Sequence, residues 1–240
     1  PLTLSDSRLA LCLGAAGSGA GAGFGMIAVQ RYASQIASSS TIRIKIFSWI
    51  TLAPATAGLV GASVTGLLID GYGYAIAFAA LAMFPLLTLV FAHGVPDRKP
   101  ATDQKHGASN RKKIMELLRL PALRRLLFVN WVVALSWDAH GFVIPILGHE
   151  RGFSASEVGG VFASFSLAAI IVRLIIPFIS GKLSARKLLI LSFCLGATAF
   201  IVYPFLQLAS AMTLCAFLFG LALGCVSVSY THLTLPTTYT

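Results

Sequence analysis

Asp138 is the residue best suited to chemistry in this 240-residue sequence, because it is a lone carboxylate near the middle of a long apolar stretch, 126–148. A charge at the centre of a membrane span costs roughly 2.5–3.5 kcal/mol on insertion scales. The side chain must therefore face a cavity, form a pair or stay protonated. Two interpretations are open: a carrier of a proton or cation, and a structural carboxylate hydrogen-bonded between helices.

Other side chains of the same stretch could line a path past Asp138. If the stretch is a helix, one flank is small and polar with one aromatic ring. That flank consists of Asn130, Ala134, Trp137, Asp138, Gly141 and Pro145. In the functional interpretation, Trp137 and Asn130 line the path of the ion. His140 is two positions from Asp138 and so points to another face, where a packed histidine and a titrating one are the alternatives.

Arg173 is a candidate partner for Asp138, although it belongs to another apolar stretch, 158–180. Counted from the basic ends of the two stretches, the residues differ in depth by about 7–8 Å at a rise of 1.5 Å per residue. A guanidinium side chain covers much of that distance. The alternative is that Arg173 extends toward the nearer water phase, as arginines near span ends do.

The elements that position these residues follow from the composition. Of all residues, 57% are hydrophobic and 11% charged, and the mean hydropathy is +0.84. Soluble domains carry about 25% charged residues, so a soluble, disordered or disulfide-built chain is excluded. Since alternation with period two is absent, the spans are helices and not barrel strands. The sequence predicts an all-α transmembrane bundle of seven spans: 9–29, 46–69, 74–92, 126–148, 158–180, 187–207 and 211–228.

The net charge of +10, from 18 Lys and Arg against eight Asp and Glu, is explained by the orientation of these spans. Fifteen of the 18 basic residues fall in loops on one side, whereas Arg8 and Arg151 fall on the other and Arg173 lies inside a span. The positive-inside rule places the basic loops in the cytoplasm. Nucleic acid is then not needed to explain the charge, while anionic lipid is an expected partner.

The distribution of polar residues predicts four segments. Residues 1–93 hold three spans, 94–125 form a basic cytoplasmic linker, and 126–227 hold four spans. Residues 228–240 are expected not to be authentic protein, because 228–237 resemble the translation of an adapter used in sequencing. A threonine-rich external tail is the alternative.

The first span carries glycines at helical spacing. Gly17, Gly21 and Gly25 share one face and predict close packing against a neighbouring helix. A dinucleotide-binding loop is excluded because no strand precedes the glycines and no acidic residue follows them before Asp70.

The segment 58–78 is similar to the fifth helix and following turn of major facilitator superfamily (MFS) transporters. The residues that match are Gly61, Gly66, Asp70 and Gly73. Two positions differ from the family pattern: Ala62 stands where proline is usual, and Thr65 stands where the first glycine of a pair is usual. The antiporter form of the motif is therefore incomplete.

The resemblance implies that the spans are helices four to ten of a twelve-helix protein, truncated at both ends. The implied function is secondary active transport of a small solute by alternating access, with protons as the first candidate for the coupling ion. The expected cellular location is the bacterial inner membrane, and the expected oligomeric state is a monomer. No cofactor, metal site or enzymatic activity is expected.

Two other functional classes are alternatives. A seven-helix receptor or photoreceptor is suggested by the span count alone, and the sequence offers no mid-membrane lysine for retinal. An intramembrane enzyme would need a motif such as Gly-x-Ser-x-Gly or His-Glu-x-x-His, and neither occurs in the sequence.

Overall fold

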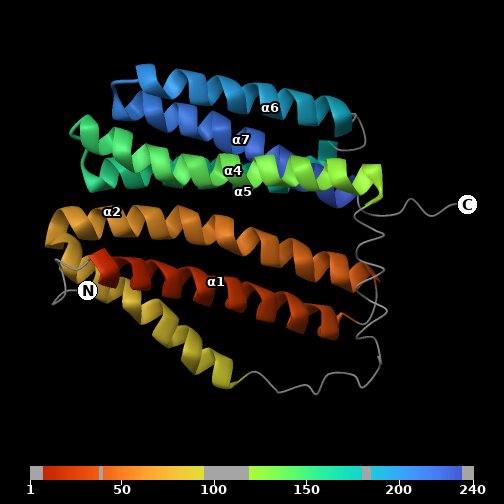
Figure 1. The fold of residues 1–240 in the computed structure, drawn as a ribbon, viewed down its shortest axis with the longest axis horizontal. Helices are drawn as coiled ribbons and strands as arrows, with labels where there is room; N and C mark the ends of the chain where they lie inside the picture. The colour runs from red at the N-terminus through yellow and green to blue at the C-terminus, as the bar shows by residue number, and fades with distance from the viewer. Residues whose placement is uncertain (1–7, 38–39, 95–118, 180–184, 234–240) are drawn as a thin grey trace, which may run out of the picture.

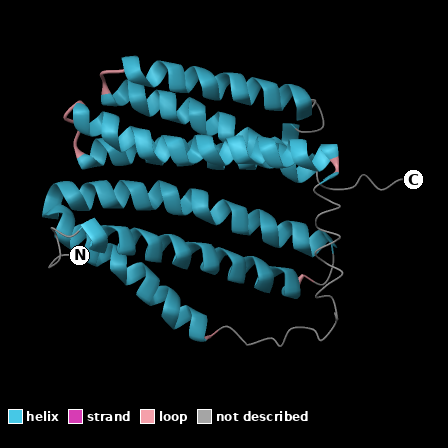
Figure 2. Ribbon diagram, in the orientation of Figure 1, coloured by secondary structure: helices cyan, strands magenta, loops and turns pink. Residues whose placement is uncertain are grey.

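The chain forms long helices throughout the part that the computed structural model describes, which is residues 8–37, 40–94, 119–179 and 185–233. Those residues contain no β-strand (Figure 2). The expected all-α fold class is confirmed for them. In chain order the elements are α1 Arg8–Ile36, α2 Ser40–His93, α4 Pro121–Glu150, α5 Ala155–Ile179, α6 Ala185–Val202, the short 3-10 helix η1 Tyr203–Phe205, and α7 Ala209–Leu233.

Helix α2 is too long to cross a membrane once. Its 54 residues would extend about 80 Å at 1.5 Å per residue, against a hydrocarbon core of about 30 Å. The backbone leaves the helical conformation at Gly73, with φ 80° and ψ 170°, a region that favours glycine. Figure 1 shows α2 folding back into two limbs. The first limb is the part before Gly73 and the second limb is the part after it.

Six helices of the described residues are long and apolar enough to cross a membrane. This count differs from the seven expected spans because 46–69 and 74–92 both lie within α2. The other expected spans each correspond to one helix, and their ends move by a few residues. The last expected span but one, 187–207, ends in η1 and the turn after it.

Two expected segments fall partly outside the described residues. Most of the linker 94–125 does so, and its last residues belong to α4, which begins at Pro121. Proline is favoured in the first turn of a helix. A backbone N–H at that position has no acceptor within the helix, so its absence in proline costs no hydrogen bond. In the tail, α7 continues to Leu233, and residues 234–240 lie outside the described part.

The helices form two groups that meet along one main contact. Helices α1 and α2 make up the first group, and α4, α5, α6 and α7 make up the second (Figure 1). The closest packing within the second group is between α5 and α7 and between α6 and α7, and the main contact between the groups is between α2 and α5. Helix α5 is therefore the element that both groups share.

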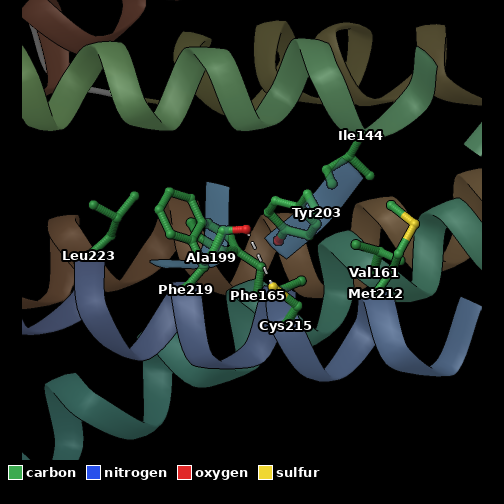
Figure 3. Packing of buried hydrophobic residues seen from close by; sticks show 10 residues of the cluster. Ile144, Val161, Phe165, Ala199, Tyr203, Met212, Cys215, Phe219 and Leu223 are labelled. Atoms are coloured by element: carbon green, nitrogen blue, oxygen red, sulfur yellow. Dashed lines mark hydrogen bonds between the residues drawn. The ribbon is translucent and has the colours of Figure 1, made fainter. Parts of the chain in front are cut away.

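The buried core belongs to the second group (Figure 3). Tyr203, Phe219 and Ile144 are its largest fully buried side chains. The ring of Phe165 on α5 packs against that of Phe219 on α7, with centroids 5.6 Å apart and planes tilted by 35°. The cluster consists of Ile144, Val161, Phe165, Ala199, Tyr203, Met212, Cys215, Ala216, Phe219 and Leu223.

The first group has little core of its own. Large apolar side chains such as Phe24 of α1 and Phe91 of α2 are mostly exposed. On a soluble protein such surfaces would drive aggregation, whereas on a membrane protein lipid tails cover them. The exposed apolar helices thus match the integral membrane class that the composition predicts.

Candidate functional site

Asp138 lies on an exposed flank of α4, together with Asn130 and Trp137. Trp137 is 41% exposed, and its ring packs edge-on against Phe165 of α5 with centroids 4.8 Å apart. The aromatic ring thus connects the Asp138 flank to the core of the second group. Arg173, the partner expected for Asp138, is half-buried on α5. The pairing of these two side chains stays a prediction.

His140 is buried in the aromatic core and lies away from the Asp138 flank. It is 2% exposed, and its ring stacks on Phe165 with centroids 4.7 Å apart while Phe162 meets it edge-on at 5.4 Å. The Tyr203 hydroxyl is 3.4 Å from Nδ1. Among the described residues, Nε2 has no hydrogen-bond partner. The structure therefore separates the side chains of Asp138 and His140, which lie two positions apart in the sequence.

Arg151 holds together two turns at one end of the second group, and the sequence interpretation gave it no role. Its Nη2 donates hydrogen bonds to the carbonyl oxygens of Tyr203 at 3.1 Å and Pro204 at 3.0 Å. Its Nη1 lies 3.0 Å from the sulfur of Met212. Basic side chains commonly bind the free carbonyls at a helix end. Arg151 therefore ties the α4–α5 turn to the α6–α7 turn.

The contact between α2 and α5 depends on glycines that let the two backbones approach. A Cβ atom added to Gly66 would lie 2.5 Å from the carbonyl oxygen of Ala155. One added to Gly159 would lie 2.5 Å from the carbonyl oxygen of Ala62. Small residues spaced four apart are the usual means of close packing between membrane helices. Gly159 was missed from sequence because it lies in a mixed run of small and apolar residues.

The two helices run in opposite directions along this contact. Farther from the turn at Gly73, Gly58 of α2 faces Ser166 of α5, and a Cβ on Gly58 would lie 2.7 Å from the Ser166 oxygen. Residue numbers thus fall along α2 while they rise along α5. The end of the first limb of α2 therefore meets the beginning of α5.

At that end, the Asp70 carboxylate accepts hydrogen bonds from the N-terminus of α5. Oδ1 accepts the Ala155 N–H at 2.9 Å and Oδ2 accepts the Ser156 N–H at 2.8 Å. Within α5, Glu157 accepts the Ser154 N–H at 2.8 Å and donates its own N–H to the Ser154 hydroxyl at 3.2 Å. This is a capping box, and the pattern Ser-x-x-Glu could have revealed it from sequence.

Asp70 lies between the expected spans 46–69 and 74–92, at the turn that joins the limbs of α2. Hydrogen bonds from Ser156 hold the pKa of the Asp70 carboxyl below its usual value. The Ser156 hydroxyl has the largest effect, and the Ser156 backbone N–H the next largest. The bonds do so because they stabilise the charged form. The residue is therefore a carboxylate at neutral pH.

A cavity of about 400 Å³ lies beside this contact, between α2, α4 and α5. Its wall is mainly apolar, with Thr65, Tyr74 and His149 as the polar side chains. Gly66, Ala155 and Gly159 belong to the same wall, so the cavity reaches the contact between the two groups. Its lining is Gly61, Ala62, Thr65, Gly66, Ile69, Tyr74, Pro145, His149, Phe153, Ala155, Val158, Gly159 and Phe162.

The glycines singled out from sequence have different surroundings. For Gly17, Gly21 and Gly25 on α1, no atom lies within 4 Å of where a Cβ would be. The packing of this face against a helix stays a prediction. Of the turn motif, Gly66 is in close contact with α5, Gly73 has the positive φ angle, and Gly61 lines the cavity.

Comparison with known families decides the class of the chain. A family model described as Major Facilitator Superfamily matches residues 1–236. The chain belongs to the major facilitator superfamily. No curated protein and no solved structure matches it. MFS proteins are secondary transporters that span the membrane many times, so transport is the general function of this chain, and a multi-pass membrane protein agrees with its six apolar helices.

Proposed function

We propose that this MFS protein is a secondary active transporter that moves a small solute by alternating access, coupled to protons. The family match gives the general class. The main observation in support is the division of the helices into two groups whose main contact is between α2 and α5. Two groups joined along one contact can rock against each other, which is the movement that alternating access requires.

Asp138 is the proposed proton carrier. It is the carboxylate nearest the middle of α4, and it lies on the exposed flank with Trp137 and Asn130. A membrane-embedded carboxylate that is protonated on one side and deprotonated on the other carries one proton per cycle. His140 is the second candidate. Its burial among aromatic rings favours a structural role, so we assign the proton to Asp138.

The membrane orientation follows from the distribution of charge. The segment 94–125 and the other basic loops face the cytoplasm, and the two limbs of α2 cross the membrane separately, which gives seven crossings. The membrane is the inner membrane of a bacterium, and the protein acts as a monomer. In this orientation Asp70, Arg151 and the turn after η1 lie on the external side.

The experiment is a comparison of two transport modes in proteoliposomes. The solute is first found by screening small molecules for those that raise the melting temperature of the purified full-length protein. We expect Asp138→Asn to abolish transport driven by a pH gradient while solute exchange continues, because exchange needs no net movement of protons.

Glu150→Gln is the matched control, since it removes a carboxylate from the exposed end of the same helix. It is expected to leave both modes unchanged. If Asp138→Asn keeps transport driven by the pH gradient, Asp138 is not the carrier. If His140→Gln alone loses it, the proton belongs to His140.

A further inference from the structure

The contact between the two helix groups ends, at the Asp70 side, in hydrogen bonds between one group and the other. Along the rest of the contact, Gly66 of α2 allows close backbone packing, and Gly58 leaves room for the Ser166 side chain. Asp70 follows Gly66 by four residues and so lies one helical turn farther on. Its two oxygens bind α5 at 2.9 and 2.8 Å. The hydrogen bonds at this end of the contact fix the relative position of α2 and α5, because hydrogen bonds are directional and apolar packing is not.

The N-terminus of α5 needs an acceptor from outside the helix. The first N–H groups of any helix have no acceptor within it. Ser154 and Glu157 satisfy each other in the capping box, which leaves the N–H groups of Ala155 and Ser156. Asp70, which comes from the other group, accepts both. The start of α5 is therefore completed only while the two groups are in contact.

The same bonds can be broken at little cost when the groups separate. Asp70 is exposed, so water can replace α5 around its carboxylate. The positive end of the α5 dipole attracts the carboxylate, which draws the groups together again. A contact that is directional and open to water is suited to form and break once in each cycle.

We propose that Asp70 is a latch residue that holds the external ends of the two helix groups together and releases them when the protein opens outward. The proposal rests on the alternating access proposed above. Asp70 is a positioning residue in this scheme: it binds neither solute nor proton, and it sets the balance between the state with the external side closed and the state with it open.

The test is the reactivity of a cysteine buried in the contact. Ser166 of α5 is buried and faces Gly58, and Ser166→Cys replaces one atom. The full-length protein in right-side-out vesicles is labelled with a membrane-impermeant maleimide. The parent protein, with its four native cysteines, supplies the background. Adding Asp70→Asn is expected to raise the labelling rate roughly three- to tenfold, because the rate follows the population of the open state.

Glu157→Gln is the matched control. It changes a carboxylate to an amide at the same helix N-terminus, but the bond that it weakens lies within α5. A purely structural role would make the two variants alike. We expect the Glu157→Gln rate to equal that of the parent with Ser166→Cys alone.

A second variant removes the bond from the other side. Ala155→Pro eliminates one N–H that Asp70 accepts, at a helix position where proline is favoured. It should raise labelling in the same direction as Asp70→Asn, and it keeps the test valid if Asp70→Asn does not fold.

Unchanged labelling in both latch variants, or an equal rise in Glu157→Gln, would overturn the proposal. The labelling does not depend on proton movement. A failed Asp138 experiment would therefore leave this result standing, and a failed latch would leave proton coupling untouched.

Discussion

Glycines at helical spacing occur in two regions of this molecule, and their surroundings differ. On α1, side chains added at Gly17, Gly21 and Gly25 would meet no atom within 4 Å. Between α5 and α7, a Cβ on Gly220 would clash with the carbonyl oxygen of Phe165, and Gly66 is similarly close to α5. Spacing alone thus indicates a face that permits close packing. It does not tell which face is occupied.

The comparison also separates two uses of a membrane helix. Helix α5 is in contact on two sides, with α2 and with α7, and it carries small residues toward both. Helix α1 is exposed over most of its length, so lipid or another helix must cover it. The first kind of helix joins the two groups, and the second lies on the outside of its group.

The largest effect is expected from Gly220→Ala and Gly66→Ala. Each adds a methyl group where backbone atoms already lie in contact, and overpacking of this kind costs about 1–3 kcal/mol. The melting temperature of the purified protein in detergent should fall for both variants.

Gly61→Ala and Gly21→Ala are the controls on α2 and α1, where nothing lies within 4 Å. They should be neutral or slightly stabilising, because alanine is the better helix former by about 1 kcal/mol. If Gly21→Ala destabilises as much as Gly66→Ala, the α1 face is packed as the sequence predicts and the comparison fails.

Arg151→Ala should have the next largest effect. It frees the carbonyl oxygens of Tyr203 and Pro204 that Arg151 now binds. Since water reaches this end of the helices, we expect the free energy of unfolding to fall by about 1 kcal/mol. This is the low end of the cost of leaving a buried carbonyl oxygen unsatisfied. Thermal unfolding of Arg151→Ala and of Arg124→Ala, which removes a positive charge from the opposite end of α4, measures the difference. Equal melting temperatures would remove the role given to Arg151.

The sequence predicts the fold of this chain better than its contacts. Hydropathy locates the long helices of the described residues, because a membrane span needs a continuous apolar run of fixed length. Gly73 is predictable for a similar reason, since a tight turn between two spans requires a residue that tolerates positive φ. In both cases one local stretch of chain determines the result.

A contact between helices depends on two segments that lie far apart in the chain. The sequence alone therefore does not predict which residues meet. Gly159 and Gly220 look like other small residues until α2 and α7 are placed against α5. The turn motif includes Asp70, but the hydrogen bonds that Asp70 accepts from Ala155 and Ser156 join residues 85 and 86 positions apart. The exposure of Asp138 and the burial of His140 agree with the different faces expected from their spacing.

The smallest effect is expected from Ser164→Ala. Its hydroxyl lies 2.8 Å from the carbonyl oxygen of Val161 within α5 and 2.9 Å from that of Thr213. Its one proton is shared between these two acceptors, and the bond to Thr213 joins α5 to α7. Hydrogen bonds between membrane helices contribute about 0.6 kcal/mol on average, so a small decrease in melting temperature is expected. Thr198→Ala is the control, because its hydroxyl bonds within α6. A larger decrease for Thr198→Ala would contradict the assignment.

The central claim is that the two groups of helices move relative to each other, and a distance across their external ends tests it most directly. Tyr72 of α2 and Leu208 before α7 are both exposed. With the native cysteines replaced, cysteines at these two positions can carry spin labels. Pulsed electron paramagnetic resonance then measures the distance between the labels. The account predicts two distance populations whose ratio changes when the solute or the pH gradient is added. A single distance that stays the same with the solute and with the pH gradient would contradict it.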